Sequence, residues 1–255
     1  MYLIQNLESD LMVTCEEIML LQVCIIVVLK LNLFMSHRDQ MYALVRAFQN
    51  TQKCVKPHEF PRFVKCNRIH AKLIKLYVIG TTIVAILFPY DYQQPVVFAL
   101  SLVYNIDTMG MTMFISVTVD TCYSEMANNL AIHFDLVRQR YEQLDLSVEP
   151  VLAVQQLVEV ISYHSEVLDL AQKMVRLFQQ LVFYLLLLIS TILCVLGYEF
   201  VMYSNIYKAL QVLMMASVMV GQAVIYTYNG SIIRERILSS SGSYITMLMS
   251  LESDN

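Results

Sequence analysis

Five stretches of the chain are rich in apolar residues and poor in charge, and polar connections separate them. They cover residues 18–35, 76–89, 96–119, 177–198 and 209–229. The last two carry no formal charge and are long enough for a helix to cross a bilayer. The first three are weaker, because 18–35 contains Lys30, 76–89 is short and 96–119 contains Asp107. The pattern predicts an all-α, polytopic membrane helix bundle with about five spans, and four spans are the main alternative.

The long connection 120–176 keeps a helical spacing of apolar residues. One series is Ala127, Leu130, Ala131, Phe134, Val137, Tyr141 and Leu144, and after a break at Glu149-Pro150 a second is Val151, Val154, Val158, Ile161, Leu168 and Val175. Charged residues occupy the other faces. We therefore expect the membrane helices to continue beyond the bilayer and to pack there as an antiparallel pair, with the two stripes as core or subunit interface.

The first connection, residues 36–75, predicts a short helix followed by a break. Met41, Leu44, Val45 and Phe48 recur at helical spacing, and the prolines at 57 and 61 interrupt that helix. The segment is strongly basic, with only Asp39 and Glu59 as acids. An interfacial helix attracted by anionic lipid is the favoured interpretation, ahead of a specific binding site.

Composition and charge support a membrane protein with a defined orientation. Apolar residues make up 57% of the chain and charged residues 15%, whereas soluble domains have about 25% charged residues. If the five stretches cross in turn, all of the 17 Lys and Arg residues except Lys208 fall on one side, which the positive-inside rule makes the cytoplasm. The N-terminus is then outside and the C-terminus inside, and Lys30 must extend toward the inner headgroups. The net charge of −4 and the lack of a basic aromatic patch give no sign of a nucleic-acid partner.

The sequence carries no motif of an enzyme. GxSxG, Walker, HExxH and GxGxxG patterns are absent, so we expect no catalytic residues and no cofactor. Cys54, Cys66, His58 and His70 lack the paired spacing of zinc ligands, and we expect no metal. Asp107 is the one carboxylate inside a span, which makes it either a functional group, such as the coupling site of a transporter, or a hydrated side chain near the surface.

The outer halves of the spans are rich in aromatic residues and methionine. A cavity lined in this way would bind small hydrophobic molecules by shape and dispersion. The ordinary alternative is an aromatic belt at the headgroups combined with helix packing. The candidate ligand-binding residues are Phe88, Phe98, Tyr104, Met109 and Tyr203.

Five short segments occur in the order that is typical of one family. They are 88–91, 119–123 with its Asp120-Thr121 pair, 164–194, 226–231 and 242–248 with its Ser243-Tyr244 pair. Together they resemble the insect odorant receptors, seven-helix membrane chemoreceptors. Under this resemblance the whole chain, 1–255, is a single odorant-receptor-like transmembrane domain with a cytoplasmic helical region at 120–176. Under the same resemblance, the first helix and most of the last helix of the parent family are missing from this sequence.

The resemblance also implies a function. Such a subunit would bind small volatile hydrophobic ligands and join a co-receptor subunit in a hetero-tetrameric cation channel, in the plasma membrane of sensory neurons. The cytoplasmic extensions would form the anchor between subunits. The alternatives are a gustatory receptor of the same superfamily, a small solute transporter that uses Asp107, and a non-conducting assembly partner.

Overall fold

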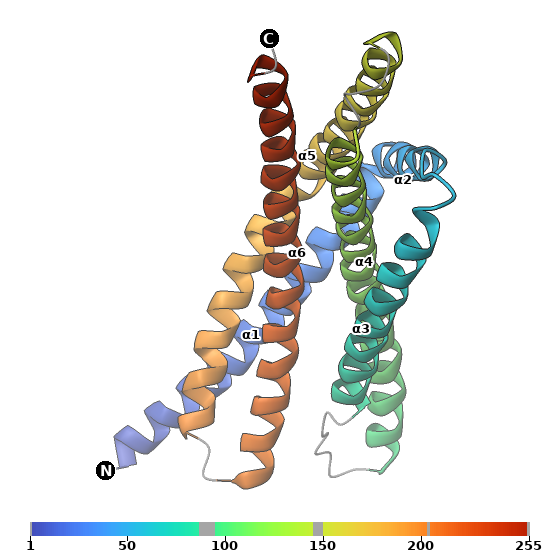
Figure 1. Ribbon diagram of the computed structural model, residues 1–255. Coiled ribbons are helices and arrows are strands. Elements are labelled where there is room, and N and C mark those ends of the chain that lie inside the picture. The colour runs from blue at the N-terminus through green and yellow to red at the C-terminus, as the bar shows by residue number, and fades with distance from the viewer. Residues whose placement is uncertain (1, 87–94, 145–149, 203–204, 254–255) are drawn as a thin grey trace. The chain divides into compact units, whose positions relative to one another are not determined.

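Every regular element in the described part of the chain is an α-helix. The computed structural model describes the backbone of residues 2–86, 95–144, 150–202 and 205–253, and no strand occurs there (Figure 1). The helices are α1 (Tyr2–Ser36), α2 (Arg38–Gln52), α3 (Phe60–Ile86), α4 (Pro95–Glu142), α5 (Pro150–Met202) and α6 (Ile206–Ser253). The predicted all-α class is confirmed.

Several of these helices have the length and composition of membrane spans. Among the described residues, Val151–Met202 and Ile206–Met247 qualify, and the pair Leu21–Ser36 and Arg38–Gln52 adds a third if it is counted as one broken span. The protein is therefore a helical membrane bundle. Side chains of residues 81–109 lie outside the description, so the spans predicted at 76–89 and 96–119 stay predictions.

The helices contribute to two compact units. One comprises residues 1–37, 74–121 and 180–225, and we call it the span unit because the predicted spans lie almost entirely within it. The other comprises residues 38–73, 122–179 and 226–255, and we call it the extension unit. Helices α3, α4, α5 and α6 each pass from one unit into the other along the chain.

The span unit has an apolar core and an apolar exterior. Its core includes Leu185, Ile189 and Ile192 of α5, each at most 1% exposed. On the outside, Val28 of α1 and Phe183 of α5 are both 63% exposed. Large apolar side chains on the outside of a helix bundle are costly in water but stable in lipid, so this surface fits a bilayer environment.

In the extension unit, α4 and α5 pack as the predicted antiparallel pair. The predicted α4 stripe from Ala127 to Tyr141 is buried, and Leu130, Phe134 and Val137 are fully covered. Ring contacts join Tyr123 to Phe178 and Tyr141 to His164, so residues late in one helix meet residues early in the other. The prediction for α4 is confirmed.

The predicted stripe on α5 is not part of the core, and its alternative role as a subunit interface stays a prediction. Val151, Val154, Val158, Ile161 and Val175 are exposed, between 39% and 74%, and Leu168 is half-buried. The buried face of α5 instead carries Ala153, Val160, Tyr163, Val167, Leu170 and Met174. Both sets of residues follow a helical 3-4 spacing. The buried set lies on the side of α5 whose aromatic rings contact α4. An apolar stripe therefore remains uncovered on α5.

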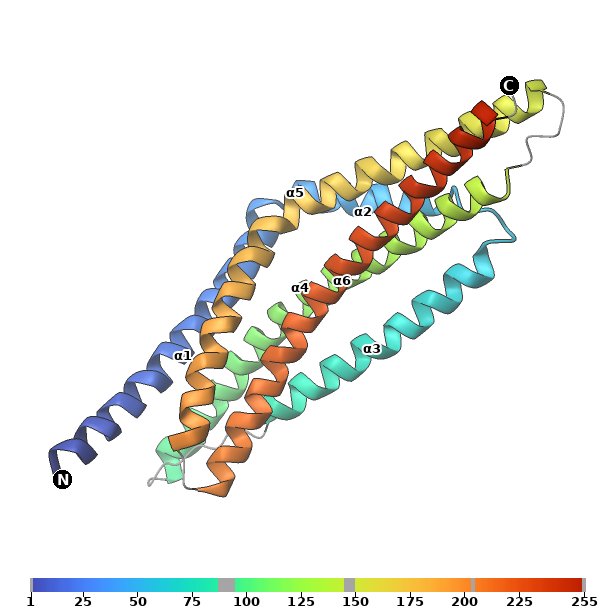
Figure 2. The same ribbon diagram turned by 60° about the vertical axis from the view of Figure 1, so that its left-hand side comes forward.

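Prolines begin two of the helices. Pro61 lies in the first turn of α3 and Pro150 opens α5, positions where the missing N–H and the fixed φ of proline are favourable. The predicted short helix in the first connection is α2, which buries Met41, Leu44 and Phe48. Helix α6 continues without a break through residues 242–248 (Figure 2).

Candidate functional site

The predicted ligand-binding residues lie outside the described side chains. Phe88 and Tyr203 fall in segments whose structure is not described. Phe98, Tyr104 and Met109 belong to α4, but the positions of their side chains are not described either, and the same holds for Asp107. The ligand pocket and the role of Asp107 stay predictions.

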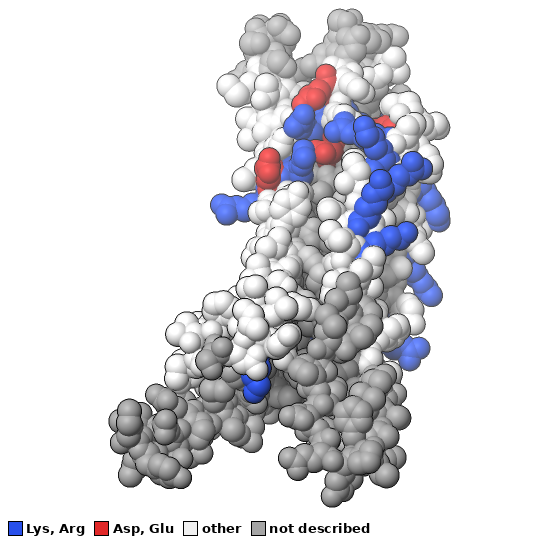
Figure 3. All heavy atoms as spheres, turned by 90° about the horizontal axis from the view of Figure 1, so that it is seen from below, with Lys and Arg blue, Asp and Glu red and all other residues white. Residues whose placement is uncertain are grey.

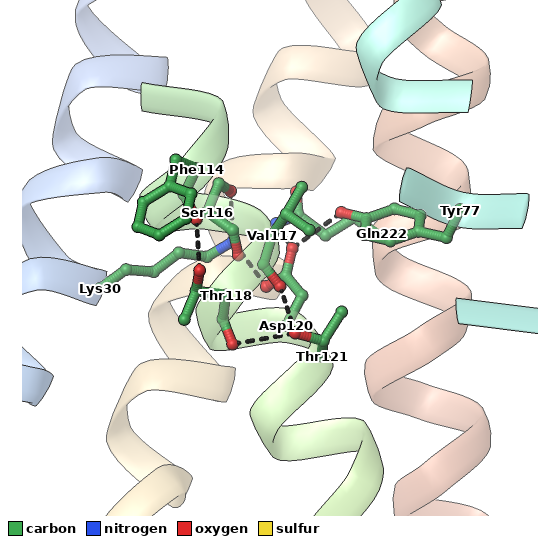
Figure 4. A network of polar contacts seen from close by, with 9 residues as sticks. All are labelled: Lys30, Tyr77, Phe114, Ser116, Val117, Thr118, Asp120, Thr121 and Gln222. Carbon is green, nitrogen blue, oxygen red and sulfur yellow. Dashed lines mark hydrogen bonds and ion pairs between the residues drawn. The ribbon is translucent and has the colours of Figure 1, made fainter. Parts of the chain in front are cut away.

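A buried carboxylate, Asp120 of α4, connects four helices within the span unit (Figure 4). Its Oδ1 atom accepts a hydrogen bond from Lys30 Nζ of α1 at 2.6 Å. Its Oδ2 atom accepts from the Tyr77 hydroxyl of α3 at 2.8 Å and from Gln222 Nε2 of α6 at 3.0 Å. We call Lys30, Tyr77, Asp120 and Gln222, together with Ser116, the Asp120 junction.

Lys30 does not extend to the headgroups as the sequence led us to expect. Its side chain and that of Asp120 are both fully buried. The Lys30 ammonium also donates to Ser116 Oγ at 2.6 Å and approaches the Ser116 carbonyl oxygen at 3.5 Å. A carboxylate, a hydroxyl and a carbonyl thus replace the water that the ammonium loses, which makes an interior position stable.

Two threonines beside the junction form hydrogen bonds within α4 itself. The Thr118 hydroxyl donates to the Phe114 carbonyl at 2.7 Å, and the Thr121 hydroxyl donates to the Val117 carbonyl at 2.8 Å (Figure 4). These two threonines therefore satisfy their hydroxyls within their own helix.

The arrangement couples the four helices through one group. A charge pair in an apolar interior is costly to desolvate and is stable only while its partners stay in place. Moving α1, α3 or α6 away from α4 would break a bond to Asp120 and leave a buried polar group without its partner. The junction can therefore act as a two-state contact during conformational change, and we expect no chemical step there.

A second buried ion pair lies in the extension unit. Arg140 of α4 donates from Nε and from one terminal nitrogen to the two oxygens of Glu59, at 3.0 and 2.9 Å. The same nitrogen donates to the Cys54 carbonyl at 2.7 Å, and the Lys56 backbone N–H donates to Glu59 at 2.8 Å. Arg140 thus holds the connection between α2 and α3 against α4.

Burial and pairing have opposite effects on the pKa values of this pair. Burial alone raises the pKa of Glu59, but the hydrogen bonds from Arg140 and from the Lys56 N–H, with the Arg140 charge, outweigh it and the pKa is lowered. Burial likewise disfavours the Arg140 cation, but Glu59 outweighs that effect and the pKa of Arg140 is raised. Both groups are therefore charged at neutral pH.

His133 lies beside this pair and is neutral. Its Nδ1 atom is 2.7 Å from the Tyr163 hydroxyl, and its Nε2 atom has no hydrogen-bond partner among the described residues. Burial, with the nearby Arg140 charge, lowers the pKa of His133 to about 4. The Arg140 guanidinium also stacks over the Tyr163 ring, 4.2 Å from its centre.

Two further features of the described residues concern metal binding and clefts. No group of three or more His, Cys, Asp and Glu side chains there could hold a metal ion. An open cleft of about 530 Å³ in the extension unit lies between the end of α4 and residues 242–247 of α6. The Tyr141 and Tyr244 rings meet beside it at 5.5 Å, so Tyr244 of the Ser243-Tyr244 pair packs against α4.

The Asp120 junction was largely missed at the level of sequence. Asp120 was noted only as part of a family motif, and Tyr77 and Gln222 were not singled out. One signal was present, because Lys30 and Asp120 are opposite charges near the same predicted end of two spans, and ionisable groups inside membranes usually pair.

Comparison with known proteins identifies the fold family. Residues 81–239, more than half of the chain, match the family model described as 7tm Odorant receptor. Neither the curated proteins nor the solved structures contain a match.

Breaking the buried pair should destabilise the protein strongly. We expect Asp120→Asn to lower the free energy of unfolding by about 3–5 kcal/mol, because it leaves the Lys30 ammonium buried without a carboxylate. The double variant Lys30→Met/Asp120→Asn should recover most of this loss, since asparagine still accepts from Tyr77 and Gln222. Thermal unfolding in detergent micelles measures both, with the exposed Glu235→Gln as control. A double variant no more stable than Asp120→Asn would contradict the pairing.

Acid should destabilise the extension unit through His133. Between pH 6.5 and about 4 the unfolded chain binds a proton that the folded chain excludes, so stability falls with pH over this window, by about 3 kcal/mol in total. The carboxylate of Glu59, whose pKa is lowered, contributes only below its ordinary value of 4.5. His133→Phe should reduce the slope of stability against pH above 4.5, whereas exposed His37→Phe should not. Part of the slope should remain, because burial also lowers the pKa values of His70 and His164. An unchanged slope in His133→Phe would rule this assignment out.

Proposed function

Because this chain belongs to the odorant receptor family, we propose that it is a ligand-binding subunit of a heteromeric cation channel in the plasma membrane of sensory neurons. Its ligands would be small, volatile, hydrophobic molecules, and its partner a co-receptor subunit. The observation that carries the proposal is the family match over residues 81–239. The family consists of receptors and ion channels rather than enzymes. The gustatory receptor and transporter hypotheses have no comparable observation in their favour.

Helix α4 provides a physical connection between the proposed ligand pocket and the Asp120 junction. Phe98, Tyr104 and Met109 lie on the same helix as Asp120, within the same unit. Met109 and Asp120 are 11 residues apart, which corresponds to about 16 Å along a helix. A ligand that displaces this part of α4 would change the contacts of Asp120 with the neighbouring spans, and would thereby shift the equilibrium between closed and open states.

The uncovered stripe on α5 supports assembly with another subunit. Val151, Val154, Val158 and Ile161 form an exposed apolar surface on the extension unit. Residues 120–176 are predicted to lie in the cytoplasm, and contiguous apolar surface outside the bilayer generally marks a protein interface. In a family that acts through heteromeric complexes, the partner subunit is the occupant that we propose for this surface.

Ligand-evoked current tests the proposed function. We expect cells that express this chain with the co-receptor to show a cation current in response to members of a broad volatile panel. Tyr104→Ala should weaken the response to an active ligand by about tenfold or more in half-maximal concentration, since it removes about 1.4 kcal/mol or more of contact. Phe183→Ala, on the exposed surface of α5, is the matched control and should respond normally.

Two results would count against this proposal. One is the absence of current across the panel although the chain reaches the cell surface with its partner. The other is a ligand-driven flux that needs no partner and is abolished by Asp107→Asn, because that result would favour a transporter.

Charge placed on the α5 stripe should prevent assembly. We expect Val154→Asp/Val158→Asp to reduce copurification with the co-receptor by about tenfold or more, because two carboxylates would have to be buried in the interface. Thermal stability of the isolated chain should change little, since both positions are exposed.

A matched control uses exposed polar positions beside the stripe on α5. Gln155→Asp/Ser162→Asp adds the same charge at two such positions along the same part of the helix. Equal loss of copurification in both variants would mean that charge, and not the apolar stripe, governs assembly.

A further inference from the structure

Three basic side chains form one exposed face of α3. Lys65, Arg68 and Lys72 are spaced by three and four residues, which places them on the same side of a helix. All three are exposed and all belong to the extension unit. Helix α3 contains no Asp or Glu over its whole length, so its own sequence offers no acid to neutralise them.

These three bases differ from most others in the extension unit. Arg62 and Arg236 meet Asp135, Lys56 meets Glu159, Arg138 meets Glu142, Arg140 meets Glu59 and Lys173 meets Asp169. Lys65, Arg68 and Lys72 form no ion pair with any carboxylate in the described part of the chain. Figure 3 shows Lys and Arg side chains in a band with few Asp or Glu among them. The positive charge of this face is therefore available to a partner.

Apolar side chains accompany the bases. Ile69 and Leu73, 54% and 58% exposed, lie beside them on the same helix. The span predicted at 76–89 begins four residues after Lys72, so in the predicted topology this face lies at the inner surface of the bilayer. Exposed bases interleaved with exposed apolar residues are typical of segments that bind the anionic, cytoplasmic leaflet.

We propose that Lys65, Arg68 and Lys72 of α3 form a binding face for the headgroups of anionic phospholipids, with Ile69 and Leu73 entering the adjoining acyl region. The three cations match negatively charged headgroups, and no acid on α3 opposes them. A site of this kind selects phosphatidylserine over phosphatidylcholine, whose headgroup carries no net charge. The inference requires only membrane placement and is independent of the proposed response to odorants.

Lipid binding by the full-length chain tests the proposal directly. The probe is fluorescently labelled phosphatidylserine, added to the purified chain in neutral detergent, with labelled phosphatidylcholine as comparison. We expect phosphatidylserine to bind more tightly, and its affinity to fall as salt is raised. Lys65→Gln/Arg68→Gln/Lys72→Gln should weaken phosphatidylserine binding by about a hundredfold, and each single substitution by about fivefold.

The control variant removes the same charge elsewhere. Lys56→Gln/Arg138→Gln/Lys173→Gln neutralises three bases that are paired with acids, and it should bind phosphatidylserine within about twofold of the unaltered chain. Circular dichroism verifies folding, and Lys72→Gln alone serves as the test if the triple variant is unfolded.

Three outcomes would overturn the proposal. Equal affinity for the two lipids is the first. The second is an equal loss in the control variant, which would reduce the effect to net charge. The third is unchanged phosphatidylserine binding in the triple variant, which would show that these three bases do not bind the headgroup.

Discussion

A lysine inside a membrane span can keep its charge solvated in two ways: its ammonium reaches the headgroups, or a carboxylate from another helix meets it. The Lys30 ammonium is met by a carboxylate from another helix, that of Asp120, which lies 90 positions away in the sequence. The pair is stable only while α1 and α4 remain in register, and Tyr77 and Gln222 extend this requirement to α3 and α6. The packing of the span unit therefore depends on an interaction that lipid cannot replace.

The extension unit uses the same principle in a different setting. Arg140 and Glu59 pair at the base of α3, and each is further satisfied by backbone groups of the preceding connection. The neutral imidazole of His133 and the hydroxyl of Tyr163 complete the cluster without adding charge. In each unit one buried carboxylate accepts hydrogen bonds from residues that are distant in the sequence. Apolar side chains pack around it and fill the rest of the core.

The sequence could predict what depends on local pattern. Apolar spacing located α4 and its buried stripe, and the breaks predicted at Pro61 and Pro150 coincide with the starts of α3 and α5. The sequence did not show which face of α5 packs within the chain, because two faces of this helix are apolar at helical spacing and hydrophobicity alone favoured the valine face. The face that packs contains Tyr163 and His164, whose polar atoms become acceptable only once His133, Arg140 and Tyr141 are brought to them. The sequence also led to a wrong position for the Lys30 side chain, because its partner Asp120 is brought to it only by the tertiary structure.

The exposed valines of α5 affect how the protein is handled during folding in the cell. Folding chaperones of the endoplasmic reticulum and cytosol retain chains that display uncovered apolar surface. A chain with such a stripe would stay in the secretory pathway until another polypeptide masks it. If the partner subunit proposed above covers this stripe, the amount of assembled protein is limited by the supply of that partner rather than by synthesis of this chain.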